Sequence, residues 1–295
     1  MENPAPNRRR PRLRSFGRRL WRGVARRWEG YLFVLGYGLV FGFLGLAAVG
    51  LTDAPTPSPV ADGFGEAQPP GAGRWLGTDA GGADQLIPTL RGAGLSVWLA
   101  AVATALGTLT GWAMGTALAA AGWRSAGRLL QSVDGWLGAF PAIGLALALV
   151  AGWGAGAWPL MIIAAAIMAM PVASQVAGWY REMDGRGDVL AARAMGWSRS
   201  RLMIDESLTH FPPRLAAWAA GVLPATLGAV TAVDFVLGRG GRLGHLLASG
   251  ARDFIEAPWL LYGPGLVLAF LIWLLAALGW AVRRRMGEGP PRRLW

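Results

Sequence analysis

The feature that most constrains the fold is a series of apolar blocks without a charged side chain. Each block is long enough to cross the hydrocarbon core of a bilayer, which takes about 20 residues of helix. Hydrophobic residues make up 54% of the chain and charged residues 15%, so we expect an all-α membrane protein. The block 135–180 is too long for one helix, and a glycine-rich stretch that ends at Pro159 predicts a turn within it. About six transmembrane helices are therefore expected: 31–50, 92–122, two within 135–180, 215–233 and 259–282.

The distribution of arginine predicts the orientation. All 28 basic residues are arginine, and ten of them precede residue 31, against two acidic residues there. Because cytoplasmic flanks carry the excess of basic residues, we expect both termini in the cytoplasm. Basic residues before an apolar block also occur in secretory signals, but the block is longer than the usual signal core of about 7 to 15 residues, which favours a retained anchor. The expected regions are a basic cytoplasmic tail (1–30), a first span (31–50), an external Pro/Gly-rich loop (51–91), a five-helix core (92–282) and a cytoplasmic tail (283–295).

The net charge of +11 indicates contact with the membrane. The run Arg8-Arg9-Arg10 predicts binding to anionic lipid head groups. No stacking aromatic side chains or folded module accompany the charge, so no nucleic acid partner is expected. The absence of cysteine excludes disulfides and thiolate metal sites. Acidic residues and histidine are sparse, so we expect neither a metal nor a cofactor.

A charged segment, 181–214, interrupts the apolar blocks on the expected cytoplasmic side. Asp188 is a predicted helix cap before two helical turns over 189–195. Gly196 suits the left-handed position that ends a helix, and Ser198 can cap the next helix. Helices this short are marginal in water, so they need a partner surface, which is either the chain's own spans or another protein.

Within the spans, Gly107, Gly111 and Gly115 place three positions without a side chain on one helix face. Such a face allows close approach of another helix, which belongs either to this chain or to a second membrane subunit.

Charge inside the spans is nearly absent, and Asp234 at the edge of the fifth span is the nearest candidate. Proton-coupled carriers ordinarily place ionisable groups at mid-depth, so we expect the energy for transport to come from elsewhere. The segment 234–258 is expected to be a polar external connection.

Three separated segments resemble, in order, bacterial ABC importer permeases of the dipeptide, oligopeptide and nickel class, and in particular the second permease of the pair. The first contains Leu76-Gly77-Thr78-Asp79, Gly82, Asp84, Gly92-Ala93 and Ser96. The second is the run Ala191-Ala192-Arg193-Ala194-Met195-Gly196-Trp197-Ser198, followed by Arg201-Leu202. The third contains Leu243-Gly244, Gly250, Arg252, Ala257-Pro258-Trp259 and Pro264-Gly265. The chain departs from the family pattern at Leu190, where a glutamate is usual, at Thr209, where a proline is usual, at Ala83, where an arginine is usual, and in a shortened stretch over 237–242.

The resemblance implies a type I ABC importer permease fold. In such importers an external binding protein delivers substrate to a pore between two related permeases, and two cytoplasmic ATPases drive transport. The resemblance also implies that the segment 181–214 couples to an ATPase groove. The residues expected to do so are Asp188, Val189, Ala191, Ala192, Arg193, Met195, Gly196, Ser198, Arg199 and Arg201. The chain has no lysine and hence no Gly-x-x-x-x-Gly-Lys phosphate loop, so ATP is expected on partner subunits and this chain is not expected to be an enzyme.

The expected function is therefore that of a permease subunit of an ABC importer for peptides in the bacterial cytoplasmic membrane. Three alternatives remain open at the level of the sequence. The same fold can carry another cargo, such as nickel chelates, opines or glycosides. The chain can also be a stand-alone secondary carrier, or a membrane scaffold that binds lipid.

Overall fold

The computed structural model describes residues 67–79, 81–120, 132, 135, 157–184, 186–198, 200–204, 211–237 and 241–285. Within these residues the structure is helical, and the β-type pairing there consists of two isolated bridges in the loop 67–85. The helices are α2 (Leu86–Ala120), α5 (Ala157–Asp184), α6 (Gly187–Ala194), α8 (Phe211–Leu237), α9 (Leu243–Arg252) and α10 (Trp259–Arg285). The predicted all-α class is confirmed for this part of the chain.

Four of the described helices are long and apolar enough to cross a membrane. They contain the stretches Leu86–Ala120, Trp158–Met183, Arg214–Leu237 and Trp259–Arg284. These stretches match the predicted second, fourth, fifth and sixth spans. The predicted first span (31–50) and third span lie outside the described residues. So do the amino-terminal tail (1–30) and most of the carboxy-terminal tail (283–295).

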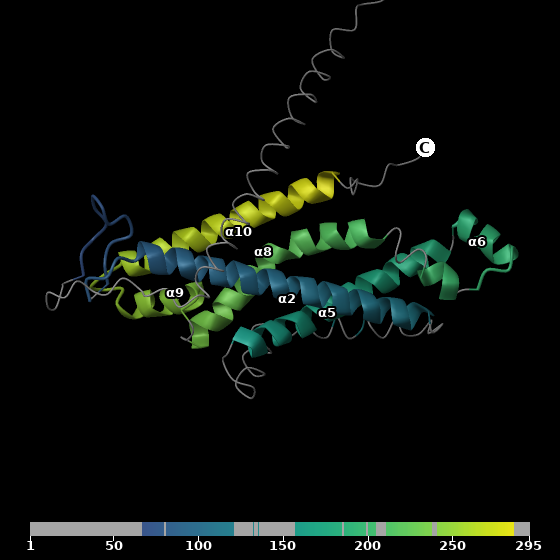
Figure 1. The fold of residues 1–295 in the computed structure, drawn as a ribbon, viewed down its shortest axis with the longest axis horizontal. Helices are drawn as coiled ribbons and strands as arrows, with labels where there is room; N and C mark the ends of the chain where they lie inside the picture. Colours follow the sequence, from purple (N-terminus) through teal and green to yellow (C-terminus); the bar gives the residue numbers. More distant parts are fainter. Residues whose placement is uncertain are drawn as a thin grey trace, which may run out of the picture.

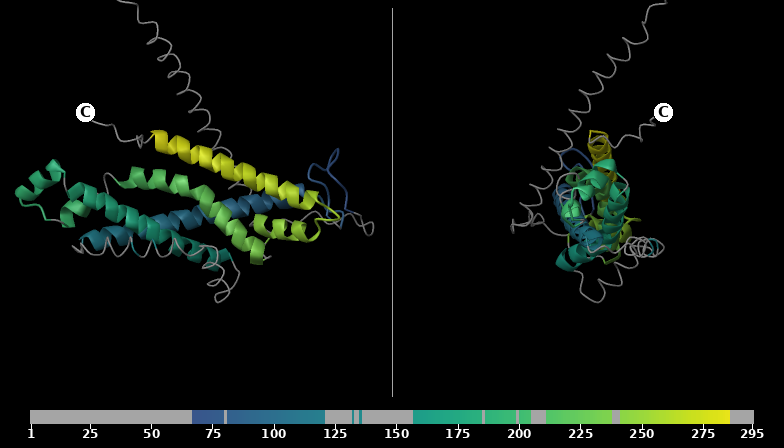
Figure 2. Two further views of the ribbon diagram at one scale, coloured as in Figure 1. Left: turned by 180° about the vertical axis from the view of Figure 1, so that it is seen from behind. Right: turned by 90° about the vertical axis from the view of Figure 1, so that its right-hand side faces the viewer.

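The long helices lie side by side in an elongated bundle (Figure 1). The main packing partners are α2 with α5, and α8 with α10, while α8 also packs against α2. The short helix α6 lies at one end of the bundle, and α9 lies at the other end together with the loop that precedes α2 (Figures 1 and 2). We call these the α6 end and the α9 end.

Two helices begin earlier in the structure than the sequence predicts. The predicted spans began after the last charged residue, whereas the helices themselves extend past that residue. α2 begins at Leu86 and not at Gly92, since the Oδ1 atom of Asp84 accepts a hydrogen bond from the Leu86 amide (3.0 Å) and caps the helix. α8 begins at Phe211, with two prolines in its first turn, where the amide groups have no helical partner in any case. The 35 residues of α2 span about 52 Å, which exceeds the roughly 30 Å hydrocarbon core.

The three glycines of α2 pack against α5 of the same chain. A Cβ atom added to Gly107 would lie 2.6 Å from the Cβ of Met168, and one added to Gly115 would lie 2.9 Å from the Cβ of Val176. Gly111 lies against the carbonyl group of Ala169, which also belongs to α5. Real Cβ atoms do not approach this closely, so the two backbones can meet here only because these positions lack a side chain.

Helix α8 contains Pro224 near its middle and changes direction along its length (Figure 2). A proline cannot donate the helical hydrogen bond, so the carbonyl of Ala220, four residues earlier, loses its usual partner. Gly279 of α10 lies directly against this carbonyl. The two helices therefore cross closely at this point, and Pro224 divides α8 into a half toward the α6 end and a half toward the α9 end.

Candidate functional site

The predicted coupling segment forms α6 and the short turn that follows it. The amide of Leu190 donates a hydrogen bond to the Arg186 carbonyl (3.1 Å), so the helix begins at Gly187 and Arg186 occupies the capping position. Arg186 has an extended backbone and makes no side-chain capping bond. The prediction that Asp188 caps this helix is therefore wrong, because the helical bonds start two residues earlier than the capping preference indicates. Asp188 is the second residue of α6.

The turn after α6 has the conformation that the sequence predicts. Gly196 has a φ of 88°, a left-handed conformation that residues with a side chain rarely adopt. The Trp197 amide bonds to the Ala192 carbonyl (3.1 Å), which closes the end of the helix. Ser198 then caps the following helical segment, since its hydroxyl accepts a hydrogen bond from the Arg201 amide (3.3 Å). Gly196 thus sets the angle between two short helical segments.

An apolar cluster holds α6 against the bundle. Val189 is only 6% exposed and packs with Tyr180, Met203 and Phe211. The Tyr180 hydroxyl donates a hydrogen bond to the Met203 carbonyl (2.9 Å), and its ring lies 4.8 Å from that of Phe211. Val189 was expected to contact a partner protein. The structure instead gives it an internal role, because the face of α6 that carries it points into this cluster.

The opposite face of α6 is exposed and largely apolar. Leu190 is 52% exposed and Met195 is 73% exposed. Trp197 is exposed as well, with the Arg201 guanidinium 4.7 Å from the centre of its ring. The other predicted residues of the described turn are also accessible: Ala191, Arg193, Gly196 and Ser198 are exposed and Ala192 is half-buried. Arg199 lies outside the described residues.

The first and third segments of the family resemblance meet at the α9 end. The indole nitrogen of Trp259, at the start of α10, donates a hydrogen bond to the Thr78 carbonyl (3.1 Å). Gly77 has a φ of 75°, and a Cβ atom there would lie 2.6 Å from the indole ring of Trp259. Leu76 lies against Gly263, one turn further along α10. The loop before α2 is thus fixed onto α10, although Thr78 and Trp259 lie 181 residues apart in the sequence.

Helix α9 is packed between the other helices through backbone contacts. The Leu243 amide donates a hydrogen bond to the Ser96 hydroxyl of α2 (3.1 Å). Gly244 lies against the Thr231 carbonyl of α8, and Gly250 lies against a carbonyl of α10. Gly92 of α2 lies against the backbone of residues 241 and 242. Four positions that the resemblance singled out, at Gly92, Ser96, Gly244 and Gly250, are therefore positions of close helix packing.

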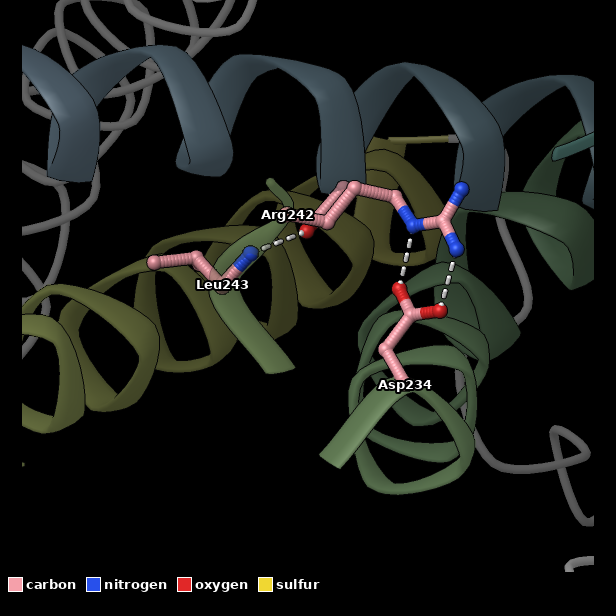
Figure 3. Close-up of polar contacts among 4 residues, drawn as sticks. Asp234, Arg242 and Leu243 are labelled. Atoms are coloured by element: carbon pink, nitrogen blue, oxygen red, sulfur yellow. Dashed lines mark hydrogen bonds and ion pairs between the residues drawn. The ribbon is translucent and has the colours of Figure 1, made fainter. Parts of the chain in front are cut away.

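A buried ion pair joins α8 to the start of α9, and sequence reasoning did not find it (Figure 3). Arg242 donates from Nε and from one terminal nitrogen to the two carboxylate oxygens of Asp234, each at 2.6 Å. The Asp234 side chain is 0% exposed and the Arg242 side chain 6% exposed. The sequence identified Asp234 as a charged residue near a span, but it did not identify Arg242 as its partner. The only signal in the sequence is that the two residues have opposite charges and lie eight positions apart.

The described residues contain no group of three or more histidine and acidic side chains that could hold a metal ion. Their chemistry is that of packing and docking: long apolar helices, an exposed short helix at one end and a tightly packed short helix at the other. These features define a multi-pass helical membrane protein.

Comparison with known proteins identifies the family. No family model matches the chain. The oligopeptide transport system permease protein OppC of Mycobacterium tuberculosis is 30% identical over 217 residues, which cover 70% of this chain and 72% of OppC. The inner membrane ABC transporter permease protein YejE of Escherichia coli is 27% identical over 237 residues, 79% of this chain and 66% of YejE. A putative peptide transport system permease protein of Brucella suis is 29% identical over 225 residues, 73% of this chain and 74% of that protein. The chain belongs to the family of ABC transport system permeases, and it is a multi-pass protein of the inner membrane.

Proposed function

We propose that the chain is one of two permease subunits of an ABC importer that carries peptides into the cell, with ATP hydrolysed by two partner ATPases. The observation that supports this most strongly is the likeness to OppC over 70% of the chain. The names of two of these relatives specify oligopeptides or peptides, which favours peptides over nickel chelates, opines or glycosides as cargo. An external binding protein would deliver the peptide.

In this proposal the α6 end faces the cytoplasm and receives the movement of an ATPase. The exposed face of α6 supports this role, because the apolar side chains of Leu190 and Met195 are uncovered in the described structure. A contiguous group of exposed apolar side chains outside the spans is a feature of protein interaction sites. Arg193 and Arg201 are exposed in the same segment and add positive charge to it, so the complementary ATPase groove would be apolar at its centre and acidic at its edge.

The buried ion pair also supports an external energy source. Within the described spans, the carboxylate of Asp234 is fully buried and both of its oxygens accept hydrogen bonds from Arg242. A carboxylate that carries protons across a membrane must exchange them with water during transport. Asp234 is instead held in a bidentate pair without access to solvent, which favours a permease driven by ATPases over a proton-coupled carrier.

The proposal is tested by isolation of the chain from native membranes in a mild detergent. We expect recovery of a sister permease and two ATPases, and ATP-driven peptide uptake after reconstitution with the external binding protein. A single chain that alone supports proton-dependent uptake would identify a secondary carrier and contradict the proposal. A chain that binds lipid and supports no uptake with its co-purified proteins would contradict it as well.

The role of α6 is tested separately by replacement of Ala191 with arginine. Ala191 is exposed, so the protein should fold, while the added charge and volume should weaken ATPase association. The matched control is Ala251→Arg, on an exposed position of α9 at the opposite end of the bundle. Equal ATPase recovery with both variants would show that α6 is not the docking helix.

A further inference from the structure

The ion pair between Asp234 and Arg242 links two helices at positions where each charge is unfavourable for its own helix. Asp234 lies in the last turn of α8, where the helix dipole is negative, and Arg242 lies at the capping position of α9, where the dipole is positive. Neither residue therefore stabilises the helix that carries it. The two charges are compatible with their positions only because each neutralises the other.

The burial of the pair adds a second argument. Two charges taken out of water lose their hydration, and a well-packed apolar pair of similar volume is often equally stable. A buried pair of this kind is thus weak evidence for stability, and it is best explained by a requirement for one arrangement of the two helices. The bidentate geometry provides such a requirement, because a planar guanidinium and a carboxylate match in one relative orientation.

The surroundings of Arg242 show what this arrangement fixes. Its backbone lies against Gly92 of α2, and the next amide, that of Leu243, bonds to Ser96 of the same helix. Its side chain reaches α8 on the other side (Figure 3). One residue thus holds the start of α9 to α2 through its backbone and to α8 through its side chain.

We propose that Asp234 and Arg242 form a positioning pair that makes α9 and the adjacent half of α8 move as one body, with Pro224 as the point where α8 bends. This inference rests on the proposed transport function, since it concerns how a movement that begins at α6 reaches the α9 end. A fixed α9 would let the bend in α8 displace the α9 end as a unit. A loose α9 would absorb the movement, so that ATP hydrolysis would continue without transport.

The test compares two double variants of the full-length protein in its complete transporter. The first variant, Asp234→Leu with Arg242→Met, removes both charges and keeps the volume, so it should reach the membrane in normal amounts. The second variant, Asp234→Arg with Arg242→Asp, exchanges the charges and keeps the pair, and it places each charge favourably for its helix. The matched control, Arg252→Met, removes an exposed arginine of α9.

The position of α9 relative to the adjacent half of α8 is measured by pulsed EPR between spin labels on Ala225→Cys of α8 and Ala251→Cys of α9. Both positions are exposed, and the chain has no cysteine of its own that would also be labelled. We expect a broadened distance distribution in the apolar variant, and a narrow one in the charge-exchanged variant and in the control. We also expect the apolar variant to lose peptide transport while it retains ATP hydrolysis.

A narrow, wild-type distribution in the apolar variant would overturn the proposal. If the apolar variant fails to accumulate in the membrane, the charge-exchanged variant provides the test. A broad distance distribution in the membrane-inserted, charge-exchanged protein would also overturn the proposal. The distance measurement does not depend on the cargo. A wild-type complex that shows a fixed α9 and no ATP-driven uptake would therefore refute the proposed function and leave the positioning pair intact.

Discussion

Different kinds of contact hold the short helix in place at each end of the bundle. At the α6 end, an apolar and aromatic cluster around Val189 and Phe211 anchors a short helix whose other face is exposed. At the α9 end, glycines, backbone hydrogen bonds and the Asp234–Arg242 pair fix a short helix from several sides. Apolar contacts are non-directional, whereas bidentate and backbone hydrogen bonds permit one geometry.

This difference suggests a division of labour in the proposed importer. A helix that follows an ATPase needs a free face and an anchor that tolerates small shifts, which the α6 end provides. A helix that transmits movement to the opposite end needs fixed geometry, which the α9 end provides. Substitutions at the two ends should therefore differ in kind: those at the α9 end should reduce stability or positional order, and those on the exposed face of α6 should reduce ATPase coupling alone.

The largest effect is expected from Asp234→Asn. This change leaves the Arg242 guanidinium buried without its counter-charge, which should lower the free energy of unfolding by about 3 to 5 kcal/mol. Thermal unfolding of the purified protein in detergent measures the effect. The matched control is Asp253→Asn, at an exposed position beside α9, where the change should stay within about 0.5 kcal/mol. Equal losses in both variants would contradict a special role for the buried pair.

A smaller effect is expected from Gly111→Ala in the middle of the bundle. The new Cβ atom would meet the Ala169 carbonyl and the Val172 side chain of α5, and such overpacking costs about 1 to 3 kcal/mol. In the control, Gly228→Ala of α8, the new atom would lie 3.8 Å from Ile272, an ordinary contact. Unfolding curves of the two variants should separate clearly. A destabilised Gly228→Ala with an unaffected Gly111→Ala would show that α2 and α5 are not in close contact.

The smallest effect on stability is expected from Gly196→Ala at the α6 end. A φ of 88° is unfavourable for alanine by about 1 to 2 kcal/mol, but the turn is exposed and can relax. The main consequence should be an altered angle after α6 and weaker ATPase association, measured by co-purification. Gly187→Ala is the control, since a Cβ atom there meets nothing within 4 Å. Normal ATPase recovery with Gly196→Ala would show that the conformation of this turn is not needed for ATPase association.

Much of the fold follows from local sequence patterns. Uncharged blocks locate the described spans because a bilayer excludes charge. Gly196 and Ser198 predict their own conformations because the left-handed backbone and the capping hydrogen bond are local properties. The regular spacing of Gly107, Gly111 and Gly115 predicts a face of close approach, although it could not say that α5 of the same chain covers that face.

The features that the sequence did not show depend on which segments meet in space. Val189 was assigned to a partner surface because the family resemblance places it in the coupling segment, yet its side chain packs in the cluster around Phe211. The pairing of Asp234 with Arg242 needs the end of α8 and the start of α9 to face each other, which no local pattern records. Asp188 illustrates a third limit, because α6 begins at Gly187 without a side-chain capping bond, so the capping preference of Asp188 does not set the helix start.

The most direct test of the central claim uses the absence of native cysteine. Single cysteines at Met195, which is 73% exposed at the α6 end, and at Ile255, which is 95% exposed beside α9, place a crosslinking group at each end of the bundle. In membranes that contain the whole transporter, the Met195→Cys variant should crosslink to an ATPase subunit and the Ile255→Cys variant should not. An ATPase crosslink from Ile255→Cys, or none from Met195→Cys, would contradict the assignment of the α6 end as the cytoplasmic coupling surface.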